Sequence, residues 1–276
     1  MNHGPLKTRA WITRLLYGVT YIIKVCLLFV LVTGCGHSSN SGSAPEPSGE
    51  TTGKGGSMAR FSIVNDYLYA IAGPDIQLFD ISTPTNPTLW NRVTVNFDIE
   101  TLFSYENQMF VGGETGLYIY DVSDPRFPKY VAKFNHARNC DPVVVQGKYA
   151  YVTLRSNNTR CFGSNNQLDI IDISVIEDPF LVKSYPMQEP NGLGVDTEKL
   201  FLCDGDAGLK VFDISDPNNI TLLDYLSGIS CYDVIPNNNL LIISGDDALL
   251  QFDYSEVPLR GLSSIQIVAD RRGGKY

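Results

Sequence analysis

Carboxylates are the side chains with most potential for chemistry in this sequence. Asp141 and Asp233 each stand at the start of a short apolar run, and Asp204 ends another. Two carboxylates at a fixed separation can hydrolyse glycosides, and oxygen-rich groups can hold calcium. The segment Cys203–Gly208 (CDGDAG) lacks the length and the final Glu of a known calcium loop. A glycoside-cleaving pair needs a defined distance between its two carboxylates, and the sequence does not give that distance for Asp141 and Asp233. We therefore assign no metal site and no cofactor. Calcium is the cation that the oxygen atoms of these side chains would suit if one were bound.

Other catalytic patterns are missing from the sequence. His136 is the one histidine between residues 58 and 268, and no Gly-x-Ser-x-Gly motif accompanies it. Phosphate-binding loops and dinucleotide fingerprints are absent as well. We assign no catalytic residue, and the sequence favours a role other than that of an enzyme. His136 could contact a ligand or be an ordinary surface histidine.

A repeated phrase identifies the elements that carry these side chains. Its central aspartates are 41, 51, 41 and 40 residues apart, and β-rich repeats of about this period are typical of propeller blades. The five copies are IQLFDIS (76–82), LYIYDVS (117–123), LDIIDIS (168–174), LKVFDIS (209–215) and LLQFDYS (249–255).

Each repeat unit divides into four strands. A β-branched and aromatic run, such as YAYVTL (149–154), precedes each phrase, an apolar strand precedes that run, and a turn with a fourth strand follows. Long helical periodicity is absent. We predict an all-β fold, a β-propeller of five four-stranded blades over residues 58–268.

The aspartate in each phrase is predicted to build a turn. Its short side chain can accept hydrogen bonds from backbone N–H groups one or two residues later. Because every unit carries this aspartate, it belongs to the scaffold and not to a binding site.

The phrase resembles the LVIVD repeat of bacterial and archaeal surface proteins, and KVFDISDP (210–217) is the copy most similar to it. Two longer stretches, 140–155 and 191–217, are similar to lipoproteins from Bacteroidetes-like bacteria. The resemblance covers essentially all of 58–268. It implies an exported β-propeller and no established enzymatic activity.

One face of the predicted propeller gathers polar side chains. These side chains lie where the innermost strands begin and in the loops beside them. Together they would form an acidic funnel that could bind a cation, a basic peptide or a glycan. Alternatively, these are solvated loop residues. The candidate ligand-binding residues are Arg60, Glu100, His136, Asp141, Arg155, Asn191, Asp204 and Asp233.

Four cysteines fall in the repeat region, and an even number in an exported chain suggests disulfides. The third unit is ten residues longer than its neighbours because of the loop RSNNTRCFGSNNQ. In a propeller, a Cys140–Cys161 bridge would hold that loop over the funnel face. Cys203 and Cys231 would face the same side in adjacent blades, and their pairing is left open.

Residues 1–34 are typical of a signal peptide. Four basic residues precede a short apolar core, Val25–Val32, that is too short to cross a membrane. The sequence VTGC (32–35) resembles a bacterial lipobox, which implies lipidation of Cys35; a plain secretory signal is the alternative. Residues 35–57 would form a Gly/Ser/Pro-rich tether, and 269–276 a C-terminal tail.

Charge and lipidation together limit the partners. Without the leader, 17 Lys and Arg stand against 30 Asp and Glu, a net charge of −13. An acidic surface repels the phosphates of nucleic acids, so we expect no nucleic-acid binding. It also repels anionic lipid headgroups, so the lipid anchor would be the contact with the membrane. Gly36 favours the outer membrane over the inner one under the sorting rule of that family. We expect an envelope-anchored binding module for an unknown envelope protein or glycan; a carbohydrate-active protein and a purely structural module are the alternatives.

Overall fold

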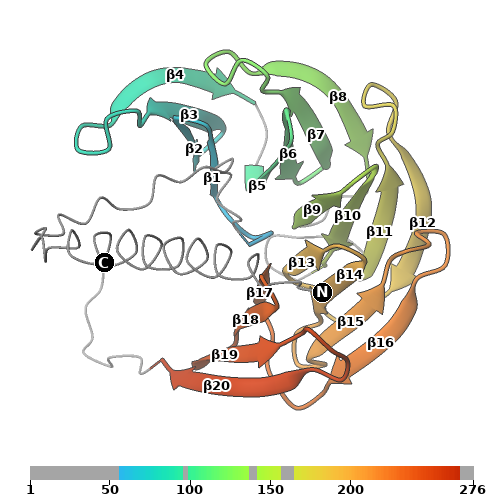
Figure 1. Cartoon of the computed structure of the whole chain (residues 1–276). Coiled ribbons are helices and arrows are strands. Elements are labelled where there is room, and N and C mark those ends of the chain that lie inside the picture. Colours follow the sequence, from blue (N-terminus) through green and yellow to red (C-terminus); the bar gives the residue numbers. More distant parts are fainter. Residues whose placement is uncertain (1–55, 96–98, 137–141, 157–164, 268–276) are drawn as a thin grey trace, which may run out of the picture. The chain divides into compact units, whose positions relative to one another are not determined.

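The computed structural model describes residues 56–95, 99–136, 142–156 and 165–267. These residues form twenty β-strands in five antiparallel sheets of four, and in every sheet the strands are ordered as in the sequence. The predicted fold is therefore confirmed: it is an all-β propeller of five four-stranded blades (Figure 1). No helix among the described residues is long and apolar enough to cross a membrane. The predicted signal peptide and Cys35 lie outside these residues.

The five blades follow one another along the chain. Blade 1 contains β1 (Phe61–Val64), β2 (Tyr67–Ala72), β3 (Asp75–Asp80) and β4 (Thr88–Thr94). Blade 2 contains β5 (Ile99–Tyr105), β6 (Gln108–Gly113), β7 (Gly116–Asp121) and β8 (Lys129–Asn135). Blade 3 contains β9 (Val143–Gln146), β10 (Tyr149–Leu154), β11 (Gln167–Asp172) and β12 (Phe180–Pro186). Blade 4 contains β13 (Leu193–Asp196), β14 (Lys199–Cys203), β15 (Leu209–Asp213) and β16 (Thr221–Leu226). Blade 5 contains β17 (Asp233–Asn237), β18 (Leu240–Ser244), β19 (Ala248–Asp253) and β20 (Arg260–Gln266).

The first strand of each blade lies at the hub. β1 lies beside β5, β5 beside β9, β9 beside β13, and β13 beside β17, so that the first strands surround a central channel. The fourth strands lie at the rim, where most of their side chains are exposed. This arrangement gives the molecule two faces. We call the face with the turns between first and second strands the lower face, and the face with the connections between blades the upper face.

Apolar clusters hold consecutive blades together. An aromatic side chain from the second strand points at the next blade in four of the units, and each is at most 1% exposed: Tyr69, Phe110, Tyr151 and Phe201. Each belongs to a cluster that includes side chains of the following blade. Burial of such rings contributes on the order of 2–3 kcal/mol each, so the blade interfaces are the main source of stability.

The repeated phrase forms the same local structure in all five blades. The Oδ1 atoms of Asp80, Asp121, Asp172, Asp213 and Asp253 each accept a hydrogen bond from the backbone N–H of the serine two residues later, at 2.8–2.9 Å. A bulge interrupts the pairing of third and fourth strands at the same point in every blade. The predicted turn-forming role of the aspartates is confirmed.

Candidate functional site

The central channel contains a cavity of about 560 Å³. All five first strands contribute to its wall, together with the turns that follow β1 and β5. This volume is within the usual range for small-molecule sites in proteins. The lining residues are Val64, Asn65, Phe103, Ser104, Tyr105, Glu106, Asn107, Val122, Val144, Val145, Gln146, Leu193, Gly194, Val195, Val234, Ile235 and Pro236.

The cavity opens toward the lower face, because the turn residues in its lining belong to that face. These turns require a left-handed backbone: φ is +52° at Asn65, +51° at Glu106 and +58° at Gly147. Asn and Gly adopt this conformation readily, whereas Glu does so rarely. Asn65, Glu106 and Gln146 lie at this end of the cavity. Val64, Val144 and Leu193 belong to the wall as well, but their side chains are buried in the clusters between blades.

The lining carries little charge. Among the residues that form it, Glu106 is the one ionisable carboxylate, and no Lys, Arg or His is present. A paired-carboxylate mechanism would need a second acid in the same wall. The lining thus offers both polar and apolar groups, and it does not assemble a catalytic pair.

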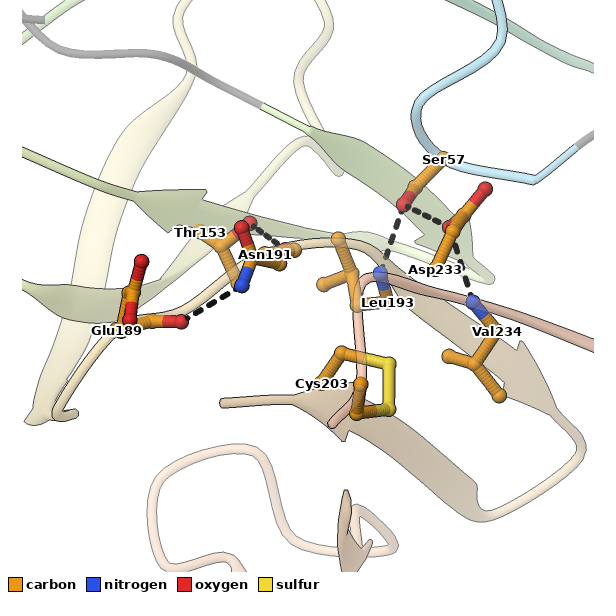
Figure 2. Close-up of a disulfide and its surroundings, with 9 residues drawn as sticks. Ser57, Thr153, Glu189, Asn191, Leu193, Cys203, Asp233 and Val234 are labelled. Carbon is orange, nitrogen blue, oxygen red and sulfur yellow. Dashed lines mark hydrogen bonds between the residues drawn. A yellow bond between two sulfur atoms is a disulfide. The ribbon is translucent and has the colours of Figure 1, made fainter. Parts of the chain in front are cut away.

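A segment before β1 crosses the channel at the upper end. The Ser57 side chain is completely buried, its Oγ accepts a hydrogen bond from Leu193 N at 2.7 Å, and it donates to Asp233 Oδ1 at 3.4 Å (Figure 2). Val234 N donates to the same carboxylate oxygen at 3.0 Å. Ser57, which the sequence placed in the tether, therefore joins blades 4 and 5 at the hub.

Asp233 lies in a confined position above the cavity. A Cβ atom on Gly56 or on Gly192 would lie 2.2 or 2.1 Å from its carboxylate oxygens, so the packing requires glycine at both positions. Burial raises the pKa of Asp233 to about 6, although the hydrogen bonds from Val234 and Ser57 act in the opposite direction. This carboxyl supports the hub and does not line the cavity.

The residues predicted to bind ligand lie elsewhere. None of the eight lines the cavity, and Asp141 is outside the described residues. Arg60 is exposed, Glu100 is partly buried in β5, and His136 is partly buried just after β8. Burial raises the pKa of Asp169 in blade 3, and the charge of nearby His136 lowers it by a smaller amount.

Two of the predicted residues bind each other across blades 3 and 4. Arg155 Nη1 donates a hydrogen bond to Asn191 Oδ1 and lies 4.0 Å from a carboxylate oxygen of Glu189. Asn191 Nδ2 donates to the carbonyl of Glu189 at 3.0 Å, and Thr153 Oγ1 donates to the carbonyl of Asn191 at 2.6 Å (Figure 2). These polar groups hold a connection between blades.

Asp204 is also occupied within the chain. Its side chain is fully buried and forms an ion pair with Lys210 at 2.5 Å. It also accepts backbone hydrogen bonds from Gln188 N at 3.0 Å and Glu189 N at 2.7 Å. Part of the acidic funnel predicted at the upper face therefore consists of side chains that already bind other groups of the chain, such as Asp204. Among the described residues, no group of three or more His, Cys, Asp or Glu is placed to hold a metal ion.

The disulfide whose pairing the sequence left open is present. Cys203 at the end of β14 is bonded to Cys231 just before β17, with 4.9 Å between Cα atoms (Figure 2). It links blades 4 and 5 on the upper face, beside the connection that holds Asp204. Cys140 and Cys161 lie outside the described residues, so their pairing stays a prediction.

The sequence matches the family described as LVIVD repeat over residues 55–95, 137–186 and 200–225. The chain carries LVIVD repeats. The matched residues fall on blades 1, 3 and 4, and the structure shows that blades 2 and 5 have the same four-stranded form. No curated protein matches the sequence.

Solved structures share the fold at low sequence identity. The Pseudomonas aeruginosa periplasmic gluconolactonase PpgL has a TM-score of 0.57 and 11% identity, over 73% of this chain and 68% of that one. Citrobacter koseri AztD has a TM-score of 0.56 and 14% identity, over 76% and 61%. The computationally designed Ika8 protein has a TM-score of 0.54 and 13% identity, over 74% and 60%. These likenesses show the propeller fold alone, and this chain spans about three fifths to two thirds of each of the three proteins.

The cavity lining was missed from the sequence. Three of its polar residues, Asn65, Glu106 and Asn107, lie in the hairpin turns NDY and ENQ, which look like ordinary turns when read alone. The available signal was positional: the turn after the first strand of each blade must lie next to the channel. The funnel predicted from the sequence lies at the opposite ends of these strands.

Proposed function

We propose that this protein is a lipid-anchored, non-enzymatic binding protein of the bacterial cell envelope that holds a small ligand in its central channel. The observation that carries the proposal is the cavity of about 560 Å³ lined by all five first strands, with Asn65, Glu106 and Gln146 at its lower end. Ligand sites in proteins are commonly concave, of this order of size, and equipped with a few polar groups that orient the ligand.

The lining favours an uncharged or cationic ligand. Glu106 offers negative potential, and no basic side chain in the lining would pair with an anion. The acidity of the whole chain acts in the same direction, since it repels anions at a distance.

A carbohydrate is the second candidate for the ligand. The amide side chains of Asn65, Asn107 and Gln146 can donate and accept hydrogen bonds with sugar hydroxyls, and Phe103 offers an apolar ring in the same wall. Under this alternative the protein is a glycan-binding member of the envelope. A protein partner at the upper face is the third candidate, supported by the exposed acidic loop residues there.

A ligand screen tests the proposal. The purified protein is screened by thermal shift against neutral, cationic and anionic metabolites, and on a glycan array. Gln146→Trp narrows the mouth of the cavity, and Lys148→Trp places the same ring on an exposed residue of the same turn that does not line it. We expect hits among neutral or cationic compounds that Gln146→Trp loses and Lys148→Trp keeps. Hits that both variants bind equally would place the ligand elsewhere.

The anchor is tested separately. Cys35→Ser removes the thiol to which the lipid would be attached, and acyl chains are what would hold this acidic chain to a bilayer. We expect the variant to appear in the soluble fraction while the wild type stays with membranes. Equal membrane association of the two would contradict lipid anchoring and would leave the cavity proposal standing.

A further inference from the structure

The lower mouth of the central cavity carries more negative than positive charge. In four blades the turn between the first and second strands contains one charged residue: Asp66, Glu106, Lys148 or Glu198. All four residues are exposed, and among the residues that the structure describes none of the three carboxylates forms an ion pair. Lys148 offsets one of the three negative charges. A cation that approaches this end of the channel is therefore attracted, and an anion is repelled.

Glu106 is the carboxylate of these turns that lines the cavity. Its backbone φ of +51° lies in the left-handed region. The equivalent turn positions of three other blades hold Asn65, Gly147 and Asn238, residues that adopt this conformation readily, and that of the remaining blade holds Thr197. A glutamate is unfavoured at such a position, and an unfavoured residue at a cavity mouth points to a role for its side chain.

Amide side chains lie near Glu106 in the same lining. Asn65, Asn107 and Gln146 each bring one carbonyl oxygen and one NH₂ group. A primary ammonium group has three N–H donors and no acceptor, and each donor needs an acceptor once the group leaves water. The amides serve hydroxyl groups equally well. The carboxylate of Glu106 is therefore the group that distinguishes a cation from a neutral ligand, because only a cation gains the attraction of opposite charge.

Aromatic rings complete this part of the wall. Phe103 and Tyr105 both line the cavity and are partly buried. The hydroxyl of Tyr105 accepts a hydrogen bond from Gly147 N at 3.0 Å, which holds this side chain between the turns of blades 2 and 3. Aromatic rings attract cations and also offer apolar surface to a carbon skeleton. The wall beside Glu106 thus suits an ammonium group attached to a small organic molecule.

We infer that the ligand of the central channel is a small primary amine whose ammonium group binds Glu106 at the lower mouth. The amide oxygens of Asn65, Asn107 and Gln146 are the acceptors for its other N–H groups. The inference rests on the proposed function, since it requires that the ligand occupies this cavity. It goes further in choosing a cationic ligand over a neutral one and in assigning that choice to one carboxylate.

Matched pairs of compounds test the choice of charge on the wild-type protein. Calorimetry compares putrescine with butanediol, phenethylamine with phenethyl alcohol, and glucosamine with glucose, so that a hydroxyl replaces the ammonium group in each pair. We expect at least one amine to bind at least tenfold more tightly than its alcohol. Equal binding within every pair, or no binding by any of the three amines, would overturn the inference. This comparison requires no variant to fold.

Two matched variants test the assignment to Glu106. Glu106→Gln keeps the size of the side chain and removes its charge, and Glu198→Gln makes the same change on the equivalent turn of blade 4, outside the cavity lining. We expect Glu106→Gln to weaken amine binding at least tenfold and to leave binding of the matched alcohol within about twofold of the wild type. Glu198→Gln should keep amine binding within about twofold. Equal losses in the two variants would contradict a contact with Glu106, since they would show that charge acts only at a distance.

The failure of this inference is distinguishable from the failure of the proposed function. An alcohol that binds as tightly as its amine and is lost in Gln146→Trp would overturn the amine inference and support a ligand in the cavity. An amine whose binding survives Gln146→Trp and Glu106→Gln alike would contradict both, because it would bind outside the channel.

Discussion

At the scale of single residues, aspartates take three different roles in this protein because their surroundings differ. In the repeated turns, hydrogen bonds from serine lower the pKa of Asp80, Asp121 and Asp213. Asp204 is buried with a lysine partner, and Asp233 is buried with hydrogen-bond donors alone. The residue type is the same in all three cases, and burial and partner decide what it does.

Asp233 should make the protein less stable as the pH rises. Its folded pKa of about 6 is above the usual 3.8, so the folded state holds this proton more tightly than the unfolded state. The stabilisation is fully present below about pH 4 and is lost as the pH rises through 6. Asp233→Asn should therefore be more stable than the wild type at pH 8, by about 2–3 kcal/mol, and close to it near pH 4. Urea unfolding at both pH values measures this, and a variant less stable at pH 8 would contradict it.

Removing Asp204 should be among the most damaging substitutions. Asp204→Ala leaves the largely buried ammonium of Lys210 without its partner and two backbone N–H groups without an acceptor. The expected loss is about 3–5 kcal/mol in the free energy of unfolding, measured with urea. Asp246→Ala, at an exposed carboxylate of the same face, serves as the control and should change the midpoint little. Adding Lys210→Met to Asp204→Ala should recover part of the loss, and no recovery would contradict the ion-pair explanation.

At the scale of elements, the Cys203–Cys231 disulfide attaches the last blade. It closes a sequence separation of 28 residues and joins blade 4 to blade 5, the last blade among the described residues. Replacing both cysteines by serine should cost about 3 kcal/mol in stability. Peptide mapping without reductant should recover the Cys203–Cys231 link in the wild type. Free thiols at both positions would contradict the pairing.

The elements were largely predictable from the sequence, and the site was not. The spacing of Asp80, Asp121, Asp172, Asp213 and Asp253 and the β-rich runs between them predict five blades, because each blade repeats one local pattern. The burial of Ser57 could not be predicted, because its neighbours in the sequence are glycines and its partners, Leu193 and Asp233, are distant along the chain. Three of the candidates chosen for charge, Arg155, Asp204 and Asp233, are bound within the chain, whereas the cavity lining has little charge.

At the scale of the whole molecule, five similar blades produce one feature that no single blade has. The cavity exists because all five first strands surround it, and its polar mouth comes from residues that differ between blades, such as Asn65, Glu106 and Gln146. The repeated phrase builds the blades, while differences between the copies give the channel its chemistry. Specificity is therefore expected at the lower mouth of the channel.

Binding of the strongest hit from the ligand screen tests that claim most directly, with calorimetry on three matched variants. Gln146→Trp alters the cavity mouth, Lys148→Trp is its control in the same turn, and Arg155→Ala alters the polar contacts of the upper face. The account predicts that Gln146→Trp weakens binding at least tenfold, while Lys148→Trp and Arg155→Ala bind within about twofold of the wild type. Undiminished binding by Gln146→Trp together with loss in Arg155→Ala would contradict it and would place the ligand at the upper face.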